Sequence, residues 1–309
     1  MLAFVLKRLL YGLISLIGIT FLVFSLLYLT GDPVQLMMPP DATVQEVEDA
    51  RVRLGFDQPF LVQYFNFVGK LARFDLGDSL IRRVPVSELI KEYFPNTLLL
   101  ATTAYLFALL VAVPAGVFAA IKRNSVFDLL ISMVVLIGQA APAYWVALMF
   151  VLFFSVQLGW FPTGGMGTFR HLVGPALSVG IFSMSRIARM ARSSMLDVLR
   201  QDYIRTAKSQ GISDRLIYFK FALKSAAIPI ITLVGVEYAV LFGGSLIAET
   251  IFSWPGIGRL IVQSVYARDY PVVQGVVMLF ACTVFLVNLI VDLLYSYLDP
   301  RIKYGKVPS

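Results

Sequence analysis

The sequence has few of the residues that build redox and metal sites. Among its 309 residues there is one cysteine, Cys282, and one histidine, His171. A single thiol cannot form an intrachain disulfide, and one cysteine with one histidine cannot supply a Cys/His zinc cluster. We therefore expect neither a disulfide framework nor a metal site in this chain.

The chain also lacks the motifs of an enzyme. It contains no G-x-x-x-x-G-K-[ST] loop to cradle nucleotide phosphates, so we expect it not to hydrolyse ATP itself. A nucleophile, a histidine and an acid cannot be grouped, because the one histidine stands at the edge of an apolar run. We expect no catalytic residue and no resident cofactor. The net charge of +7 does not indicate nucleic acid, since the basic residues lie in loops between apolar runs.

Long runs without charge are what the sequence has in abundance. Hydrophobic residues make up 58% of the chain and charged residues 15%, and the mean hydropathy of +0.79 is too high for one soluble domain. A helix needs about 20 apolar residues to cross a bilayer. The expected spans are residues 9–30, 97–121, 129–156, 171–185, 226–248 and 272–297. The sequence predicts an all-α integral membrane protein with about six transmembrane helices.

The first and the fourth of these apolar runs differ from the others. The first run is too long for a secretory signal and lacks a small-residue cleavage site, so we interpret it as a retained helix. The fourth run is the weakest, because Arg186, Arg189 and Arg192 follow it at three-residue intervals. We expect this helix to continue into the cytoplasm.

The distribution of Lys and Arg sets the orientation. Most of them fall at the two ends, at 122–123 and between 186 and 224, whereas the two short loops on the other side carry few. Both termini are therefore predicted to be cytoplasmic. The whole chain, 1–309, is interpreted as one transmembrane domain.

The long external segment 31–96 is expected to form a small folded subdomain. Thr43-Val-Gln-Glu46 is a capping box that opens a short helix, and Gly55 is placed to end that helix with a left-handed residue. A second helix, rich in apolar residues, is expected to begin at Phe60.

A cytoplasmic loop, 193–225, carries the pattern helix, glycine, helix. Helix-forming residues from Asp202 precede Gly211, and Ser213 then stands where a second helix would need its N-cap. Because glycine tolerates positive φ, the chain can turn sharply there and project a short surface helix.

The residues of this loop resemble the EAA loop of ABC importer permeases. Arg205-Thr206-Ala207 stand at the EAA positions, with Arg205 replacing the acidic residue, and Gly211 stands at the loop glycine. The downstream Leu-Pro is absent at its usual spacing. Other ordered motifs are similar to the dipeptide, oligopeptide and nickel permease family: Gly31-Asp-Pro33, Asp57-Gln-Pro59, Asp75-Leu-Gly77, Ala248-Glu-Thr-Ile-Phe-Ser-Trp-Pro-Gly-Ile-Gly258, Arg268-Asp-Tyr-Pro271 and Asp299-Pro-Arg301.

The resemblance implies that the chain, 1–309, is a single transmembrane permease domain with the type I ABC importer permease fold. It also implies that this domain lies in the cytoplasmic (inner) membrane of a bacterium or archaeon and works with a set of partners. These are a second homologous permease subunit, two ABC ATPase subunits that bind ATP and Mg²⁺, an external solute-binding protein, a peptide substrate and the lipid bilayer. The loop 193–225 would couple this subunit to an ATPase subunit. Its candidate coupling residues are Tyr203, Arg205, Thr206, Ala207, Gly211 and Asp214.

Two further features are candidates for the translocation pathway. Glu237 lies in the middle of the fifth span, where an ionised carboxylate costs about 2.5 kcal/mol or more unless it faces a cavity or a partner. It either lines the pathway or holds helices together. Turn-forming residues gather in two external segments, with Trp254, Pro255 and Gly256 in the first and Asp269 in the second. They suit a re-entrant or gate-forming loop, and the alternative is an ordinary connector.

The sequence leaves the cargo open. Dipeptides, longer peptides, glutathione, nickel and other small solutes all fit the resemblance. An ion-coupled secondary transporter would explain Glu237 as a coupling-ion site, but it would not explain the loop around Gly211.

Overall fold

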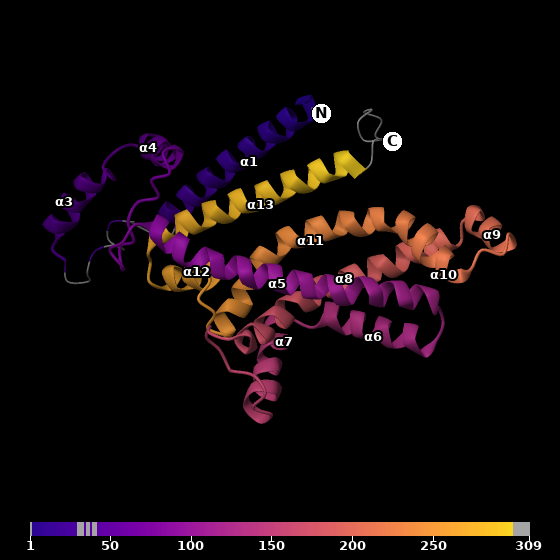
Figure 1. Cartoon of the computed structure of the whole chain (residues 1–309). Coiled ribbons are helices and arrows are strands. Elements are labelled where there is room, and N and C mark those ends of the chain that lie inside the picture. Colours follow the sequence, from indigo (N-terminus) through magenta and orange to yellow (C-terminus); the bar gives the residue numbers. More distant parts are fainter. Residues whose placement is uncertain (1, 30–33, 35–37, 39–41, 299–309) are drawn as a thin grey trace. The chain divides into compact units, whose positions relative to one another are not determined.

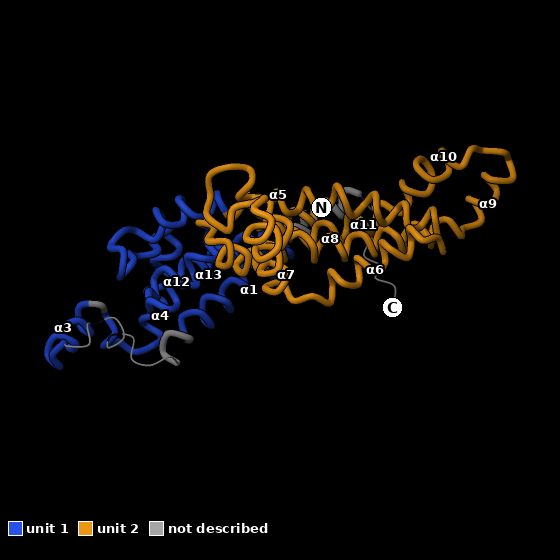
Figure 2. Tube along the Cα trace, turned by 90° about the horizontal axis from the view of Figure 1, so that it is seen from below, with its two compact units in different colours: residues 1–96, 256–286 blue, residues 97–255, 287–309 orange. Residues whose placement is uncertain are grey.

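The computed structural model describes residues 2–29, 34, 38 and 42–298. The motifs Gly31-Asp-Pro33 and Asp299-Pro-Arg301 lie outside the described residues. In the part of the chain that is described, the regular elements are helices, and they divide into two compact units (Figures 1 and 2). Unit 1 comprises residues 1–96 and 256–286, and unit 2 comprises residues 97–255 and 287–309.

Unit 1 contains the first helix and the described part of the segment 31–96, which the sequence predicts to be an external subdomain. Its helices are α1 (Leu2–Leu29), α3 (Val44–Leu54), α4 (Phe60–Ala72), the start of α5 (Val86–Ile121), α12 (Ile257–Tyr266) and the first part of α13 (Tyr270–Leu298). The core between α5, α12 and α13 is apolar and includes Val86, Leu89, Ile257, Leu260 and Val276.

The expected helices of the external subdomain are confirmed. Thr43 and Glu46 form a complete capping box at the start of α3, and Gly55 ends that helix with φ 75°. The next helix begins at Phe60 as expected. Tyr64 of α4 lies against Thr20 of α1, with 3.0 Å between their hydroxyl oxygens, so α4 is anchored to the first helix.

Unit 2 is built around two long helices that pack against each other. These are α8 (Phe169–Leu199) and α11 (Leu223–Ile251). The unit also contains the rest of α5 and the end of α13. Its other helices are α6 (Val126–Ala140), α7 (Ala143–Phe150), the π-helix η1 (Val151–Gln157), α9 (Asp202–Ser209), α10 (Asp214–Leu216) and the π-helix η2 (Ile217–Ala222). The close approach of α5 to α8 requires Gly180, because a Cβ there would lie 2.9 Å from the carbonyl oxygen of Ala104.

The third expected span, residues 129–156, is broken. The helices α6 and α7–η1 meet at a bend of 108°, at Ala141 and Pro142. Proline has no N–H and pushes the residue before it out of the helical region, and Ala141 is accordingly extended, with ψ 129°. The apolar run therefore forms two helices that point in different directions.

Most of the expected spans fall on helices that could cross a membrane. Among the described residues, four helices are long and apolar enough to cross a bilayer, and the bent pair makes a fifth if it counts as one span. The expected fourth span lies in α8, a 31-residue helix that continues past Arg186, Arg189 and Arg192. Those arginines lower its hydropathy, which is why this helix is the least apolar of the long ones.

Candidate functional site

The loop around Gly211 folds as a short helical hairpin. The helix α9 ends at Ser209, Gly211 takes φ 76°, and α10 begins after Ser213. The Gly211 and Ile212 N–H groups donate to the carbonyl oxygens of Lys208 and Ala207, which satisfies the end of α9. Ser213 is the N-cap residue as predicted, although its side chain makes no capping hydrogen bond. In both views α9 and α10 lie at one end of unit 2 (Figures 1 and 2).

One face of α9 is buried in its own chain. Ile204 is 1% exposed and Ala207 8% exposed, and both belong to a cluster with Ile217 and Ala222 of η2. Of the six residues proposed for coupling, Ala207 therefore supports the hairpin from within. This burial fixes the direction in which α9 projects.

The other face of α9 is open and polar. Tyr203, Arg205, Thr206 and Asp214 are exposed. The Tyr203 hydroxyl donates to Ser225 Oγ at 3.1 Å, and Arg205 Nη1 lies 3.6 Å from Asp202 Oδ1 in an ion pair between two exposed side chains. Such a pair contributes about 1 kcal/mol or less to stability. The face is thus a prearranged surface of polar and aromatic groups.

Glu237 is buried at the contact of α8 and α11. Its side chain is 2% exposed, and Glu237 Oε1 lies 3.1 Å from Arg186 Nη1. The Ser183 hydroxyl donates to Glu237 Oε2 at 3.0 Å. The carboxylate is therefore paired within its own chain, and this pairing offsets the free-energy cost of burying a charge inside a membrane protein.

A cavity of about 180 Å³ lies beside this ion pair. Arg186 and Ser183 line it together with residues of the start of α7 and of α11. Glu237 does not line the cavity, whereas the Arg186 side chain is 39% exposed. The structure thus places Arg186, and not Glu237, on the cavity wall.

Three arginines of α8, Arg186, Arg189 and Arg192, each have a polar partner on another helix. Arg189 donates to Gln139 Oε1 of α6 at 2.9 Å, and Arg192 donates two hydrogen bonds, of 2.6 and 2.8 Å, to the Asp128 carboxylate of α6. Sequence reasoning did not identify these partners. The sequence does contain a pattern that places Asp128 at the start of a helix, because Asp128 stands three residues after Ser125, which caps α6.

Two family models match this chain over most of its length. The model described as "Binding-protein-dependent transport system inner membrane component" matches residues 112–304. The model of the corresponding N-terminal part matches residues 1–101. The chain belongs to this family of inner membrane permease components.

Relatives of the permease component match from end to end. The "Dipeptide transport system permease protein DppB" of Alkalihalophilus pseudofirmus is 41% identical over 98% of this chain and 100% of the relative. The "Glutathione transport system permease protein GsiC" of Salmonella typhimurium is also 41% identical, with the same coverage. The "Oligopeptide transport system permease protein AppB" of Bacillus subtilis is 40% identical, again over 98% of this chain and 100% of the relative.

Solved structures of ABC transporters show the same fold. A structure of the MetNI methionine ABC transporter in an inward-facing conformation matches with a TM-score of 0.59 and 19% identity, over 68% of this permease component and 96% of that chain. A chain of an amino acid ABC transporter with histidines matches with a TM-score of 0.54 and 18% identity, over 68% of this component and 94% of that chain. The chain therefore has the permease fold of ABC importers.

The residues proposed for an external gate fall in different units of the permease component. Trp254, 2% exposed, lies in the core of unit 2 with Phe252, and its N–H donates to the carbonyl oxygen of Glu249. Pro255 follows it, and Gly256 is the N-cap residue of α12 in unit 1.

Asp269 of unit 1 is 3% exposed and is fixed by a loop far away in sequence. Its carboxylate accepts hydrogen bonds from the Ser79 hydroxyl and, at 3.1 Å, from the Leu80 N–H. Asp269 thereby joins the turn before α13 to the segment that precedes α5. Its role in a gate stays a prediction.

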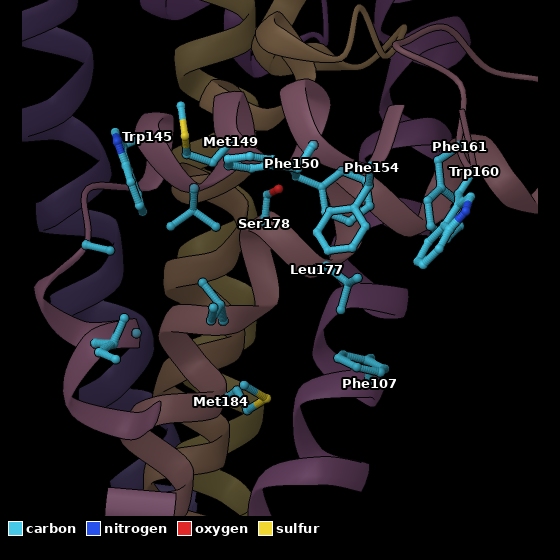
Figure 3. Close-up of a pocket in the computed structure, with 16 residues that line it drawn as sticks. Phe107, Trp145, Met149, Phe150, Phe154, Trp160, Phe161, Leu177, Ser178 and Met184 are labelled. Atoms are coloured by element: carbon cyan, nitrogen blue, oxygen red, sulfur yellow. The ribbon is translucent and has the colours of Figure 1, made fainter. Parts of the chain in front are cut away.

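A larger, apolar pocket lies under the bend of the third span. Its volume is about 490 Å³, and it is lined from α5, α6, α7, η1 and α8 by aromatic, aliphatic and methionine side chains, among them Phe107, Trp145, Phe154 and Met184 (Figure 3). Ser178 reaches its wall, but the hydroxyl donates to the carbonyl oxygen of Gly174. This pocket offers apolar surface and no charged group.

Proposed function

We propose that this chain is a permease subunit of an ATP-driven importer that carries dipeptides or oligopeptides across the cytoplasmic membrane. The observation that carries the proposal is full-length identity of about 40% to relatives named as dipeptide and oligopeptide permeases. A second candidate cargo is glutathione, because a relative named as a glutathione permease is 41% identical over the same length. Both cargoes are short peptides with free carboxylates.

Two ATPase subunits would supply the energy, with ATP and Mg²⁺ bound by them and not by this chain. The exposed face of α9 would dock into a groove of one ATPase subunit, with Tyr203, Arg205 and Thr206 as contacts and Gly211 as the turn that sets the angle. A second permease subunit would complete the pathway, and an external binding protein would deliver cargo. This arrangement requires both termini of the chain to lie in the cytoplasm.

The Glu237 pair is proposed to stand at the wall of this pathway. Arg186 presents the open side of the pair, and Glu237 and Ser183 hold it from behind. Trp254, Pro255, Gly256 and Asp269 are proposed to belong to the external gate. The burial of Trp254 and Asp269 suits parts of a gate that is packed in protein.

Cross-linking tests the proposed docking face. In a variant with Cys282→Ser, a single cysteine would be introduced as Arg205→Cys on the exposed face or as Ala207→Cys on the buried face. We expect Arg205→Cys to cross-link to an ATPase subunit in the purified complex and Ala207→Cys not to, since the latter side chain is 8% exposed. Equal cross-linking of the two, or cross-linking of neither, would exclude this face as the docking surface.

Competition tests the cargo. Purified complexes in proteoliposomes, supplied with the binding protein, would take up a labelled dipeptide in the presence of excess unlabelled oligopeptide or glutathione. If the proposal is right, unlabelled peptides abolish uptake. Uptake of labelled glutathione in a parallel assay, with no uptake of the dipeptide, would move the chain to the second candidate, and uptake of neither would reject both.

A further inference from the structure

The 180 Å³ cavity beside the Glu237 pair has a cation on its wall. Arginine carries five N–H donors in a planar fork, and the ion pair with Glu237 uses Nη1. Among the described residues no other partner of Arg186 is found, so Nε and Nη2 are available to a ligand. A planar carboxylate is the group that such a fork binds best.

A helix N-terminus reaches the same cavity. The bend at Ala141 and Pro142 starts a new helix at Ala143, and Ala143 lines the cavity. The N-cap residue is Pro142, and no side chain caps the first N–H groups of α7. Unsatisfied N–H groups and the positive end of the helix dipole favour an anion there. The break in the third span and Arg186 thus independently favour negative charge at one place.

The size of the cavity limits what can enter it. A cavity of about 150 Å³ holds a benzene molecule, so about 180 Å³ accommodates one end of a short peptide and not the whole of it. The remaining wall is mostly apolar and includes Phe182, Val240 and Ile247. Such a wall suits the carbon atoms next to a terminal carboxylate.

We propose that Arg186 binds the C-terminal carboxylate of the transported peptide in this cavity. The proposal rests on the proposed function and names the group of the cargo that this chain recognises. The amino end of a peptide does not fit, because no carboxylate lines the cavity among the described residues, and nearby Glu237 is 2% exposed and already paired with Arg186 and Ser183. Glu237 is a positioning residue: it holds the guanidinium at the cavity wall.

The variants are chosen so that no buried charge is left unpaired. Removing Arg186 alone would leave Glu237 ionised and unpaired in the core, which destabilises proteins strongly. The double variant Arg186→Gln with Glu237→Gln removes both charges and keeps hydrogen-bonding groups at both positions. Arg189→Gln is the matched control, because Arg189 lies one turn further along α8, is exposed, and does not line the cavity.

The experiment measures equilibrium binding of a labelled tripeptide to the purified complex in nanodiscs, without the binding protein. Unlabelled tripeptide with a free carboxylate and the same tripeptide as its C-terminal amide compete for the site. We expect the free acid to compete about ten- to a hundredfold more strongly, the value of a charge-assisted hydrogen bond. The double variant is expected to lose this preference, and Arg189→Gln is expected to keep it.

Three results would overturn the proposal. Equal competition by acid and amide in the unmodified complex, a preference that survives in the double variant, or no peptide binding would each reject Arg186 as the carboxylate site. ATP-dependent peptide uptake by the unmodified complex is measured in parallel. If uptake occurs while the preference does not depend on Arg186, the inference fails and the proposed function stands.

Discussion

Asp128 and Arg192 form the most complete ion pair in unit 2. Two hydrogen bonds join the carboxylate to the guanidinium, the Asn124 N–H also donates to Asp128, and the Asp128 side chain is 6% exposed. Removing one partner of such a pair leaves a buried charge without compensation. The pair therefore fixes the start of α6 against α8.

We expect Arg192→Ala to lower the free energy of unfolding by about 2–4 kcal/mol, because it leaves the Asp128 carboxylate, which is 6% exposed, without its cation. The control is Asp197→Ala on α8, where the side chain is exposed and the change should be within about 0.5 kcal/mol. Thermal or denaturant unfolding of the purified complex compares the two. Similar losses for both variants would show that the ion pair contributes nothing of its own.

Glu237 gives a second prediction at this scale. Glu237→Gln keeps an acceptor for Ser183 and a partner for Arg186 but removes the negative charge, so we expect assembly to persist and transport to change. Assembly is read from co-purification of the partner subunits, and transport from initial uptake rates. Normal uptake of every cargo tested would remove Glu237 from the pathway.

For individual helices, the sequence was sufficient to predict the ends that are set by capping residues and turns. Thr43 with Glu46, Gly55 and Gly211 were each assigned from the sequence, and each takes the expected conformation. The break at Ala141 and Pro142 was missed because the run from 129 to 156 contains no charged residue to mark an interruption. Proline is tolerated in many transmembrane helices, so its presence alone did not decide between a kink and two helices.

The capping box of α3 gives this helix a pH dependence. Hydrogen bonds from the Thr43 backbone N–H and from its hydroxyl lower the pKa of Glu46 below its usual value of 4.5. A lowered pKa means that the stabilisation is present above pH 4.5 and is lost as the pH falls through the pKa of the folded state. Amide protection of Val44–Leu54, measured by hydrogen exchange and corrected for intrinsic rates, should fall in that range.

Glu46→Gln is expected to reduce this protection at neutral pH and to flatten its pH dependence, because the titrating carboxylate is removed while the Thr43 hydroxyl still accepts from the backbone N–H at position 46. If the variant kept the pH dependence of the unmodified chain, another group would have to be responsible.

The turn at Gly211 gives the second prediction for an element. A side chain at φ 76° is strained, so we expect Gly211→Arg to leave membrane insertion intact and to uncouple ATP hydrolysis from transport. Gly211→Asn is the control, since asparagine adopts left-handed φ most readily among the other residues. The ratio of peptide transported to ATP hydrolysed should fall for arginine and stay near that of the unmodified complex for asparagine. An unchanged ratio for Gly211→Arg would remove α9 from the coupling mechanism.

At the scale of the whole molecule, composition established the class of protein and short motifs established the family. Apolar runs alone indicated a membrane protein of unknown purpose, and the loop around Gly211 with its accompanying motifs indicated an importer permease. The family models confirm that assignment. What the sequence could not supply were contacts between distant residues, such as Arg186 with Glu237 and Ser79 with Asp269, because no local pattern specifies which helices meet.

The cavity at Arg186 illustrates this limit. It needs the bend after α6, the packing of α8 on α11 and the pairing of Glu237 at the same time. Sequence reasoning correctly singled out Glu237 as an unusual charge in a span. It could not show that the partner arginine, and not the carboxylate, faces the open space.

We propose that this chain moves peptides with energy from ATPase subunits encoded elsewhere. Peptide uptake by proteoliposomes that contain the complex tests this, with ATP or with ADP inside the compartment that holds the ATPase subunits. We expect uptake with ATP and the binding protein, no uptake with ADP, and no dependence on a proton or sodium gradient. Uptake driven by an ion gradient in the absence of ATP would contradict it.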